Sequence, residues 1–93
     1  MRMTPLERKT IQQAIASVDP DAKVYLFGSR TDDASKGGDI DLLAISSHIT
    51  LMDKLNILAE LHRKLGEQKI DLVVQADASE PFARLAIQQG IAL

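Results

Sequence analysis

The sequence has no cysteine and no tryptophan, and its aromatic residues are one tyrosine and two phenylalanines. Without cysteine, the chain has neither a disulfide framework nor a thiolate metal site, which is compatible with a reducing cytoplasm. The formal net charge is −2. A nucleic-acid binder usually carries a basic face, and a single-strand binder carries aromatic stacking platforms. The composition therefore disfavours a nucleic-acid partner.

Long apolar runs are also absent. No stretch approaches the ~18 consecutive apolar residues of a membrane-spanning helix. Met1-Arg2-Met3 leads into a polar helical pattern without the apolar core of a signal peptide. We therefore expect a cytoplasmic protein without a membrane partner. Hydrophobic residues make up 45 % and charged residues 26 % of the chain, a balance that predicts one globular domain over residues 1–93.

Hydrophobic periodicity and turn residues predict the element order α-β-β-α-β-α, an α/β (α+β) fold. Helices are expected at residues 5–19, 50–65 and 81–89, and strands at residues 23–27, 39–46 and 69–74. The tail at residues 91–93 fits either a short strand or irregular chain. The connection between the first two strands is too short for a parallel crossover, so these strands should pair antiparallel. The next two are joined through a helix and can be parallel, which predicts a small mixed sheet with helices packed on it.

The helix starts and the buried helix faces can also be predicted. Thr4 with Glu7 forms a capping-box pattern, and Thr50 with Asp53 begins the second helix. Apolar residues at roughly helical spacing mark the faces expected to be buried. These are Leu6, Ile11, Ala14, Ile15 and Val18 on the first helix, and Leu51, Leu55, Leu58 and Leu65 on the second.

The carboxylates of Asp39 and Asp41 carry the strongest chemical signal. Because they lie two residues apart on a predicted strand, both side chains leave the same face. Adjacent carboxylates repel each other unless a cation or a proton neutralises them, and hard oxygen ligands of this kind suit Mg²⁺. The alternative is the polar outer face of an edge strand. Leu43 and Ile45 follow on the same face, however, and a solvent-facing strand does not explain them well.

Asp71 lies in the middle of the otherwise apolar strand at residues 69–74. If this strand lies beside the one that carries Asp39 and Asp41, Asp71 can share their face. Three carboxylates could then hold two metal ions for an in-line displacement at phosphorus. Taken alone, Asp71 is better explained as a structural acid with satisfied hydrogen bonds, so the three acids are informative mainly as a set.

Gly28 and Ser29 follow the buried strand at residues 23–27. Glycine permits a close backbone approach, and a serine that opens a turn offers a hydroxyl and N–H groups to a phosphate. A plain turn after a strand is the simpler explanation of this pair by itself. His48 and His62 are isolated in the sequence, and structural or solvent-exposed roles are favoured for them over metal ligation.

Together these residues resemble a known signature. The strings Leu26-Phe27-Gly28-Ser29 and Gly38-Asp39-Ile40-Asp41-Leu42-Leu43, with Asp71 on a later strand, resemble the DNA polymerase beta-like nucleotidyltransferase superfamily, and specifically its minimal nucleotidyltransferases. The resemblance covers nearly the whole chain, including the element order. It implies Mg²⁺-dependent transfer of a nucleoside monophosphate, AMP in the first instance, from ATP or another nucleoside triphosphate to an acceptor hydroxyl, with release of pyrophosphate.

The resemblance also implies a role for each site residue. Gly28 and Ser29 would hold the β- and γ-phosphates, and Arg30 is equally well explained as a phosphate contact or as a solvated side chain. Asp39 and Asp41 would ligate two Mg²⁺ ions. Asp71 would ligate one ion and help to deprotonate the acceptor hydroxyl, in line with general-base catalysis.

The chain departs from the family pattern in the loop before Asp39. The nine residues between Ser29 and Asp39 are one fewer than is common, and Asp33 stands where a glycine is often found. Gly37 and Gly38 can compensate by tightening the loop. Asp32 and Asp33 add two negative charges near the expected phosphate path, which opposes triphosphate binding.

The resemblance further implies a partner. Larger family members carry a helical domain that binds the acceptor or the base, so we expect a partner protein or a second copy of the chain to complete the site. Family members of this size often pair with a small helical HEPN protein as a toxin–antitoxin couple. The nucleotidyltransferase is then the antitoxin, in some cases by adenylylating a tyrosine of the toxin.

Two other classes of protein share parts of this pattern: a binding domain without turnover and other Asp-x-Asp enzymes. A catalytically weak domain could neutralise a partner by contact alone, and it would show apolar surface on its helices and little triphosphate turnover. Other Asp-x-Asp enzymes fit less well. A haloacid dehalogenase-like phosphatase usually has Thr or Val where Leu43 stands and needs a lysine and a longer chain, and an Asp-x-Asp glycosyltransferase needs a far larger domain.

Because Asp39 and Asp41 share a strand face, changing either to asparagine should abolish Mg²⁺-dependent binding of a nucleoside triphosphate. The measurement is a titration of each variant with ATP, with and without Mg²⁺. Unchanged affinity in either variant would remove that residue from the metal site.

Overall fold

The computed structural model describes residues 3–28, 40–66 and 69–93, and its elements follow the predicted order with one short strand added. The elements are α1 (Pro5–Ala16), β1 (Lys23–Phe27), β2 (Ile40–Ile45), α2 (Leu51–Leu65), β3 (Ile70–Gln75), α3 (Pro81–Gln89) and β4 (Ile91–Ala92). The fold is therefore the expected small α+β arrangement. The tail forms a strand, which is one of the two predicted alternatives.

The strands form one mixed sheet in the order β3-β2-β1-β4. β1 and β2 pair antiparallel with Phe27 opposite Asp41, and β2 and β3 pair parallel with Asp41 beside Asp71. Both pairings confirm the expectation from the connection lengths. β4 adds to the free edge of β1 in antiparallel orientation, and the Leu93 N–H donates to the Val24 carbonyl at 2.9 Å.

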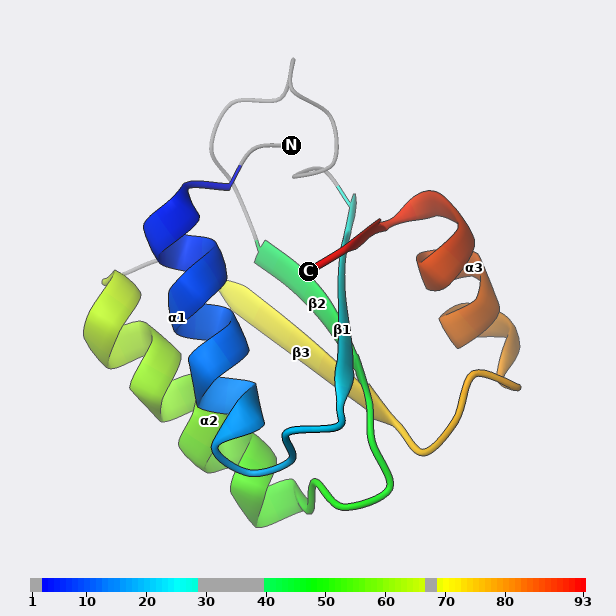
Figure 1. Cartoon of the computed structure of the whole chain (residues 1–93), viewed down its shortest axis with the longest axis horizontal. Coiled ribbons are helices and arrows are strands. Elements are labelled where there is room, and N and C mark those ends of the chain that lie inside the picture. Colours follow the sequence, from blue (N-terminus) through cyan, green and yellow to red (C-terminus); the bar gives the residue numbers. More distant parts are fainter. Residues whose placement is uncertain (1–2, 29–39, 67–68) are drawn as a thin grey trace.

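Helices cover both faces of the sheet. α1 and α2 lie side by side on one face, and α3 lies on the other (Figure 1). The core between the sheet and the helix pair contains Ile11, Ile15, Leu26, Leu42 and Leu61, each almost completely buried. The smaller core under α3 is built around Leu43, Ala83 and Ala86. Since successive strand residues point to opposite faces, β2 contributes alternately to the two cores.

The predicted helix starts are confirmed. In both capping boxes a threonine hydroxyl accepts from the backbone N–H three residues on, and the acid at that position accepts from the threonine N–H. The residues are Thr4 with Glu7 and Thr50 with Asp53. These bonds satisfy backbone donors that a helix N-terminus otherwise leaves unpaired. α3 begins at Pro81 without a side-chain cap from Glu80.

The predicted buried faces were partly wrong. Leu6, Leu51 and Leu55 are 68, 73 and 51 % exposed, whereas Ile57 and Leu61 are the buried residues of α2. Spacing alone did not distinguish the two apolar stripes of α2. The packing of α2 against both α1 and the sheet selects the stripe that contains Ile57 and Leu61, and Leu58 and Leu65 lie partly buried beside it.

Two boundaries also differ from the prediction. α1 ends at Ala16 and not at Asp19, with Ser17 as its C-cap. The strand predicted at residues 39–46 begins at Ile40 among the described residues and ends at Ile45. Among the helices of the described residues, none is long and apolar enough to cross a membrane.

A buried polar cluster ties the loop after α1 to the loop after β2. The Ser46 hydroxyl donates to Asp19 Oδ2 at 2.5 Å and accepts from the backbone N–H groups of His48 and Ile49 at 3.0 and 3.2 Å. Asp19 Oδ1 also accepts from the Asp21 N–H. The hydrogen bond from Ser46, followed by that from Asp21, lowers the pKa of the Asp19 carboxyl below its usual value. The cluster fixes the end of the sheet opposite to the carboxylates of Asp41 and Asp71.

Replacing Ser46 with alanine should lower the free energy of unfolding by about 1–3 kcal/mol, because buried hydrogen-bonding groups lose their partner. The measurement is urea unfolding at about pH 7 and about pH 3. Since the folded-state pKa of Asp19 is lowered, its contribution is present above the usual pKa and is lost as the pH falls through the lowered value. The Ser46→Ala variant should therefore lose less stability on acidification than the native chain. Equal losses would show that the cluster does not contribute to the acid sensitivity.

Candidate functional site

Two carboxylates lie side by side where β2 and β3 begin. Asp41 and Asp71 are the second residues of their strands and are paired in the parallel register. Their strand neighbours Ile40, Leu42 and Leu72 are buried against α1 and α2, so the two acids project to the opposite face. Neighbouring strands are roughly 4.8 Å apart, which makes the two carboxylates direct neighbours. Asp71 is exposed and Asp41 is half-buried.

Gly28 approaches Asp41 from the end of β1. The backbone of Gly28 has φ +80°, and a Cβ added there would lie 2.4 Å from Asp41 Oδ2. A side chain at Gly28 would be strained by the backbone conformation and would require the Asp41 carboxylate to move. The group that approaches the backbone at Gly28 is the carboxylate of Asp41, and the approach of a phosphate there stays a prediction.

The structure thus brings three of the six predicted site residues to one end of the sheet: Gly28, Asp41 and Asp71. The others, Ser29, Arg30 and Asp39, lie outside the described residues. Within residues 3–28, 40–66 and 69–93, no three histidine, aspartate or glutamate side chains lie close enough together to hold a metal ion. The predicted set of three carboxylates includes Asp39, so the described part of the site is the pair Asp41 and Asp71.

The pair Asp41 and Asp71 has a packed apolar layer on one side and solvent on the other. Along the same face of the sheet, Leu43 and Val73 follow the two acids and pack with Ala83 and Ala86 of α3. The carboxylates therefore stand at the border between a packed apolar layer and solvent. Two adjacent carboxylates in such a place repel each other, and a hard divalent cation removes that repulsion.

An aromatic pair lies next to the carboxylates and was not predicted as part of the site. Phe27, directly opposite Asp41 in the register, contacts Phe82 of α3 edge to face, with ring centroids 5.3 Å apart and planes at 81°. Phe27 belongs to the string that resembles the family signature, but no role in the site was predicted for its side chain, and Phe82 lies outside that signature. Their scarcity in the chain was the available signal, because both phenylalanines of the sequence meet at this point.

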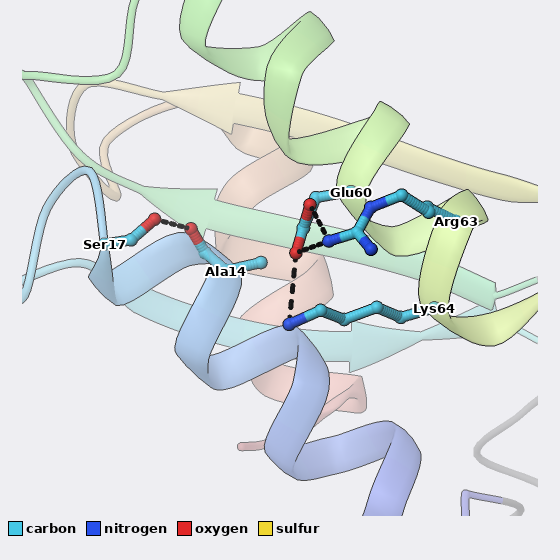
Figure 2. A network of polar contacts seen from close by, with 5 residues as sticks. All are labelled: Ala14, Ser17, Glu60, Arg63 and Lys64. Atoms are coloured by element: carbon cyan, nitrogen blue, oxygen red, sulfur yellow. Dashed lines mark hydrogen bonds and ion pairs between the residues drawn. The ribbon is translucent and has the colours of Figure 1, made fainter.

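The charged network on α2 belongs to a different surface. Glu60 accepts from Arg63 Nη2 at 2.7 and 2.8 Å and pairs with Lys64 Nζ at 3.1 Å (Figure 2). In the same view, the Ser17 hydroxyl donates to the Ala14 carbonyl on α1. The hydrogen bonds from Arg63 and Lys64 lower the pKa of Glu60. Exposed pairs of this kind contribute little stability, and α2 lies on the face of the sheet opposite to Asp41 and Asp71.

The two histidines are exposed and lie apart from the carboxylates. His48 follows the far end of β2, where its backbone N–H donates to Ser46, and His62 lies on α2. These places agree with the structural or solvent-exposed roles expected from the sequence.

The chain was also compared with known proteins. The sequence model of the family described as polymerase beta, nucleotidyltransferase matches residues 9–93. The comparison with curated proteins found no match. The family match covers every helix and strand from α1 onward except the first turn of α1, and it includes all six predicted site residues.

Gly28→Ala should disturb the site, and Gly66→Ala provides a matched control. Both glycines have positive φ, +80° and +82°, but no atom lies within 4 Å of a Cβ added at Gly66. Each variant should lose roughly 1–2 kcal/mol of stability from the backbone conformation. Only Gly28→Ala should displace the Asp41 carboxylate and abolish Mg²⁺-dependent ATP binding, measured by titration calorimetry. Loss of binding in both variants, or in neither, would contradict the assigned contact.

Proposed function

The chain belongs to the polymerase beta nucleotidyltransferase family, and from this premise we propose that it transfers a nucleoside monophosphate from a nucleoside triphosphate to an acceptor hydroxyl. The observation that carries the proposal is the in-register pair of Asp41 and Asp71 beside Gly28. The pair stands at the edge of a layer that otherwise packs apolar residues against α3, and adjacent carboxylates in such a place suit the ions of metal-assisted phosphoryl transfer.

The carboxylates fit Mg²⁺. Asp41 and Asp71 offer hard oxygen ligands from adjacent strands, and Mg²⁺ is commonly bound by one or two carboxylates together with substrate phosphates. Asp39 is proposed as the further ligand that allows two ions to be held. When bound, Mg²⁺ neutralises charge on the phosphates and polarises the phosphorus–oxygen bonds.

The protein residues position the reactants and move the proton. Gly28 lets the Asp41 carboxylate lie close to the end of β1, and the backbone there and the Ser29 hydroxyl are offered to the phosphates. The acceptor oxygen forms a bond to the α-phosphorus, the bond from that phosphorus to pyrophosphate breaks, and the hydroxyl proton passes to the Asp71 carboxylate. Asp71 suits this role because it is the more exposed of the two described acids and can be reached by an acceptor.

We propose AMP as the transferred group and a small helical partner protein of the HEPN type as the acceptor, with the chain acting as antitoxin. The exposed apolar side chains at the start of α2 support a protein partner. Leu51, Met52 and Leu55 are 73, 64 and 51 % exposed and lie within one helical turn of one another. Contiguous apolar surface of this kind often marks a protein-binding site.

The same surface favours a second candidate function. A domain that neutralises a helical partner by contact alone needs apolar surface and does not need turnover. The two candidates differ in the use of Asp71, which contact alone does not require.

Transfer of label tests the proposed activity. The protein is incubated with Mg²⁺, α-labelled ATP and lysate of the source cell, with Asp41→Asn as the control. A labelled macromolecule formed only with the native chain supports transfer, and its mass identifies the acceptor. If ATP and the other three ribonucleoside triphosphates give no label, the activity is contradicted and contact alone is favoured.

Asp71→Asn separates binding from chemistry. This variant should retain part of the nucleotide affinity, because Asp41 remains, while the rate of label transfer falls by roughly 100-fold or more. The rate and the affinity are measured on the same preparation. A normal transfer rate would show that Asp71 is structural.

A further inference from the structure

A small apolar cavity opens beside the carboxylates, between the end of β1 and one flank of α3. Its volume is about 260 Å³, and it is lined by Phe27, Gly28, Phe82, Leu85, Ala86 and Gln89. Phe82 and Leu85 are 42 and 51 % exposed although both are large and apolar. The family signature includes Phe27 and Gly28 and does not account for the residues from α3.

The cavity shares two residues with the surroundings of Asp41. Phe27 is the cross-strand partner of Asp41, and the Cα of Gly28 lies against the Asp41 carboxylate. A molecule that places its phosphates at Asp41 and Asp71 can therefore reach the cavity with the part attached to those phosphates. The position makes the cavity part of the same binding region.

The chemistry of the lining selects the part that enters. Among the described residues that line the cavity, none is charged, so these residues offer no counter-charge to a phosphate. Two edge-to-face phenylalanines and Leu85 offer contact surface to a flat ring. The Gln89 amide supplies both a donor and an acceptor for the edge of such a ring.

The volume is consistent with a ring and too small for a whole nucleotide. Pockets for drug-sized ligands usually span roughly 300–1,000 Å³, and this cavity falls just below that range. We propose that it receives the nucleobase of the nucleoside triphosphate. This inference rests on the proposed function and adds the subsite that recognises the substrate.

The covalent structure of a nucleotide favours the base over an aromatic side chain of the acceptor. The base is joined through one ribose to the phosphates that lie at Asp41 and Asp71, so binding the phosphates holds the base close to the cavity at no further cost in association entropy. An acceptor side chain would have to enter the same space from a separate molecule.

Paired ligands and paired variants test the proposal. Binding of Mg²⁺-tripolyphosphate, which lacks a base, is compared with binding of the four ribonucleoside triphosphates, for the native chain, Leu85→Ala and Leu6→Ala. Leu6 is the matched control because it is also a largely exposed leucine, at 68 %, and lies on α1, on the face of the sheet opposite to α3. Circular dichroism checks that each variant is folded.

Leu85→Ala should weaken binding of the preferred triphosphate roughly tenfold, because the base loses apolar contact, and should leave tripolyphosphate binding unchanged. Leu6→Ala should alter neither affinity. Equal affinities for all five ligands in the native chain, or an equal loss for triphosphate and tripolyphosphate in Leu85→Ala, would overturn the nucleobase subsite while leaving the proposed function intact. If no ligand binds in the presence of Mg²⁺, the proposed function fails and the subsite with it.

A fluorescence measurement gives an independent readout. The sequence has no tryptophan, so Phe82→Trp places a single indole at the cavity. Its emission should change on addition of the preferred triphosphate and not on addition of tripolyphosphate. A variant that binds the triphosphate without any change in emission would contradict the proposal. Unchanged nucleotide affinity in Leu85→Ala together with reduced label transfer would instead assign the cavity to the acceptor.

Discussion

The parallel register of β2 with β3 is the constraint on which the rest of the structure depends. It places Ile40 beside Ile70 and Leu42 beside Leu72, and all four side chains are buried against α1 and α2. A shift of β3 by one residue would turn Ile70 and Leu72 out of this core and turn Asp71 into it, while the side chains of β2 kept their places. The hydrophobic core therefore determines that Asp41 and Asp71 stand together on the other face. The site needs no separate device to bring these acids together.

One part of the face that carries the acids packs against α3, and the other part carries the candidate site. α3 covers the part of this face where Leu43, Ala83 and Ala86 are buried. The face is exposed to solvent at Asp71, near the start of β3. The edge-to-face pair of Phe27 and Phe82 marks the boundary. α3 leads directly into β4, and β4 pairs with β1. This pairing fixes the C-terminal end of α3 beside Gly28. The apolar cavity and the carboxylates thus belong to one arrangement.

Some structural features could be read directly from local residues. The capping box of Thr4 with Glu7, the helix starts at Thr50 and Pro81, and the strand around Leu26 depend on side chains within a few positions, and all were predicted. The buried face of α2 could not be predicted in this way, because Leu51, Leu55, Ile57 and Leu61 are all apolar and occupy two stripes of one helix. Only the surfaces that α2 meets decide which stripe is buried. The exposed stripe then becomes available to a partner.

The candidate site also has features that follow from the local sequence and features that depend on tertiary packing. The sequence by itself determined which carboxylates are candidates for the chemistry, because acids two positions apart on a predicted strand should share a face whatever the strand pairs with. It also indicated the family, which the match over residues 9–93 establishes. Only the tertiary structure decided that Asp71 lies beside Asp41, that the Asp41 carboxylate lies where a side chain at Gly28 would be, and that Phe82 contacts Phe27. These contacts join segments far apart in the chain, and strand register and helix packing create them.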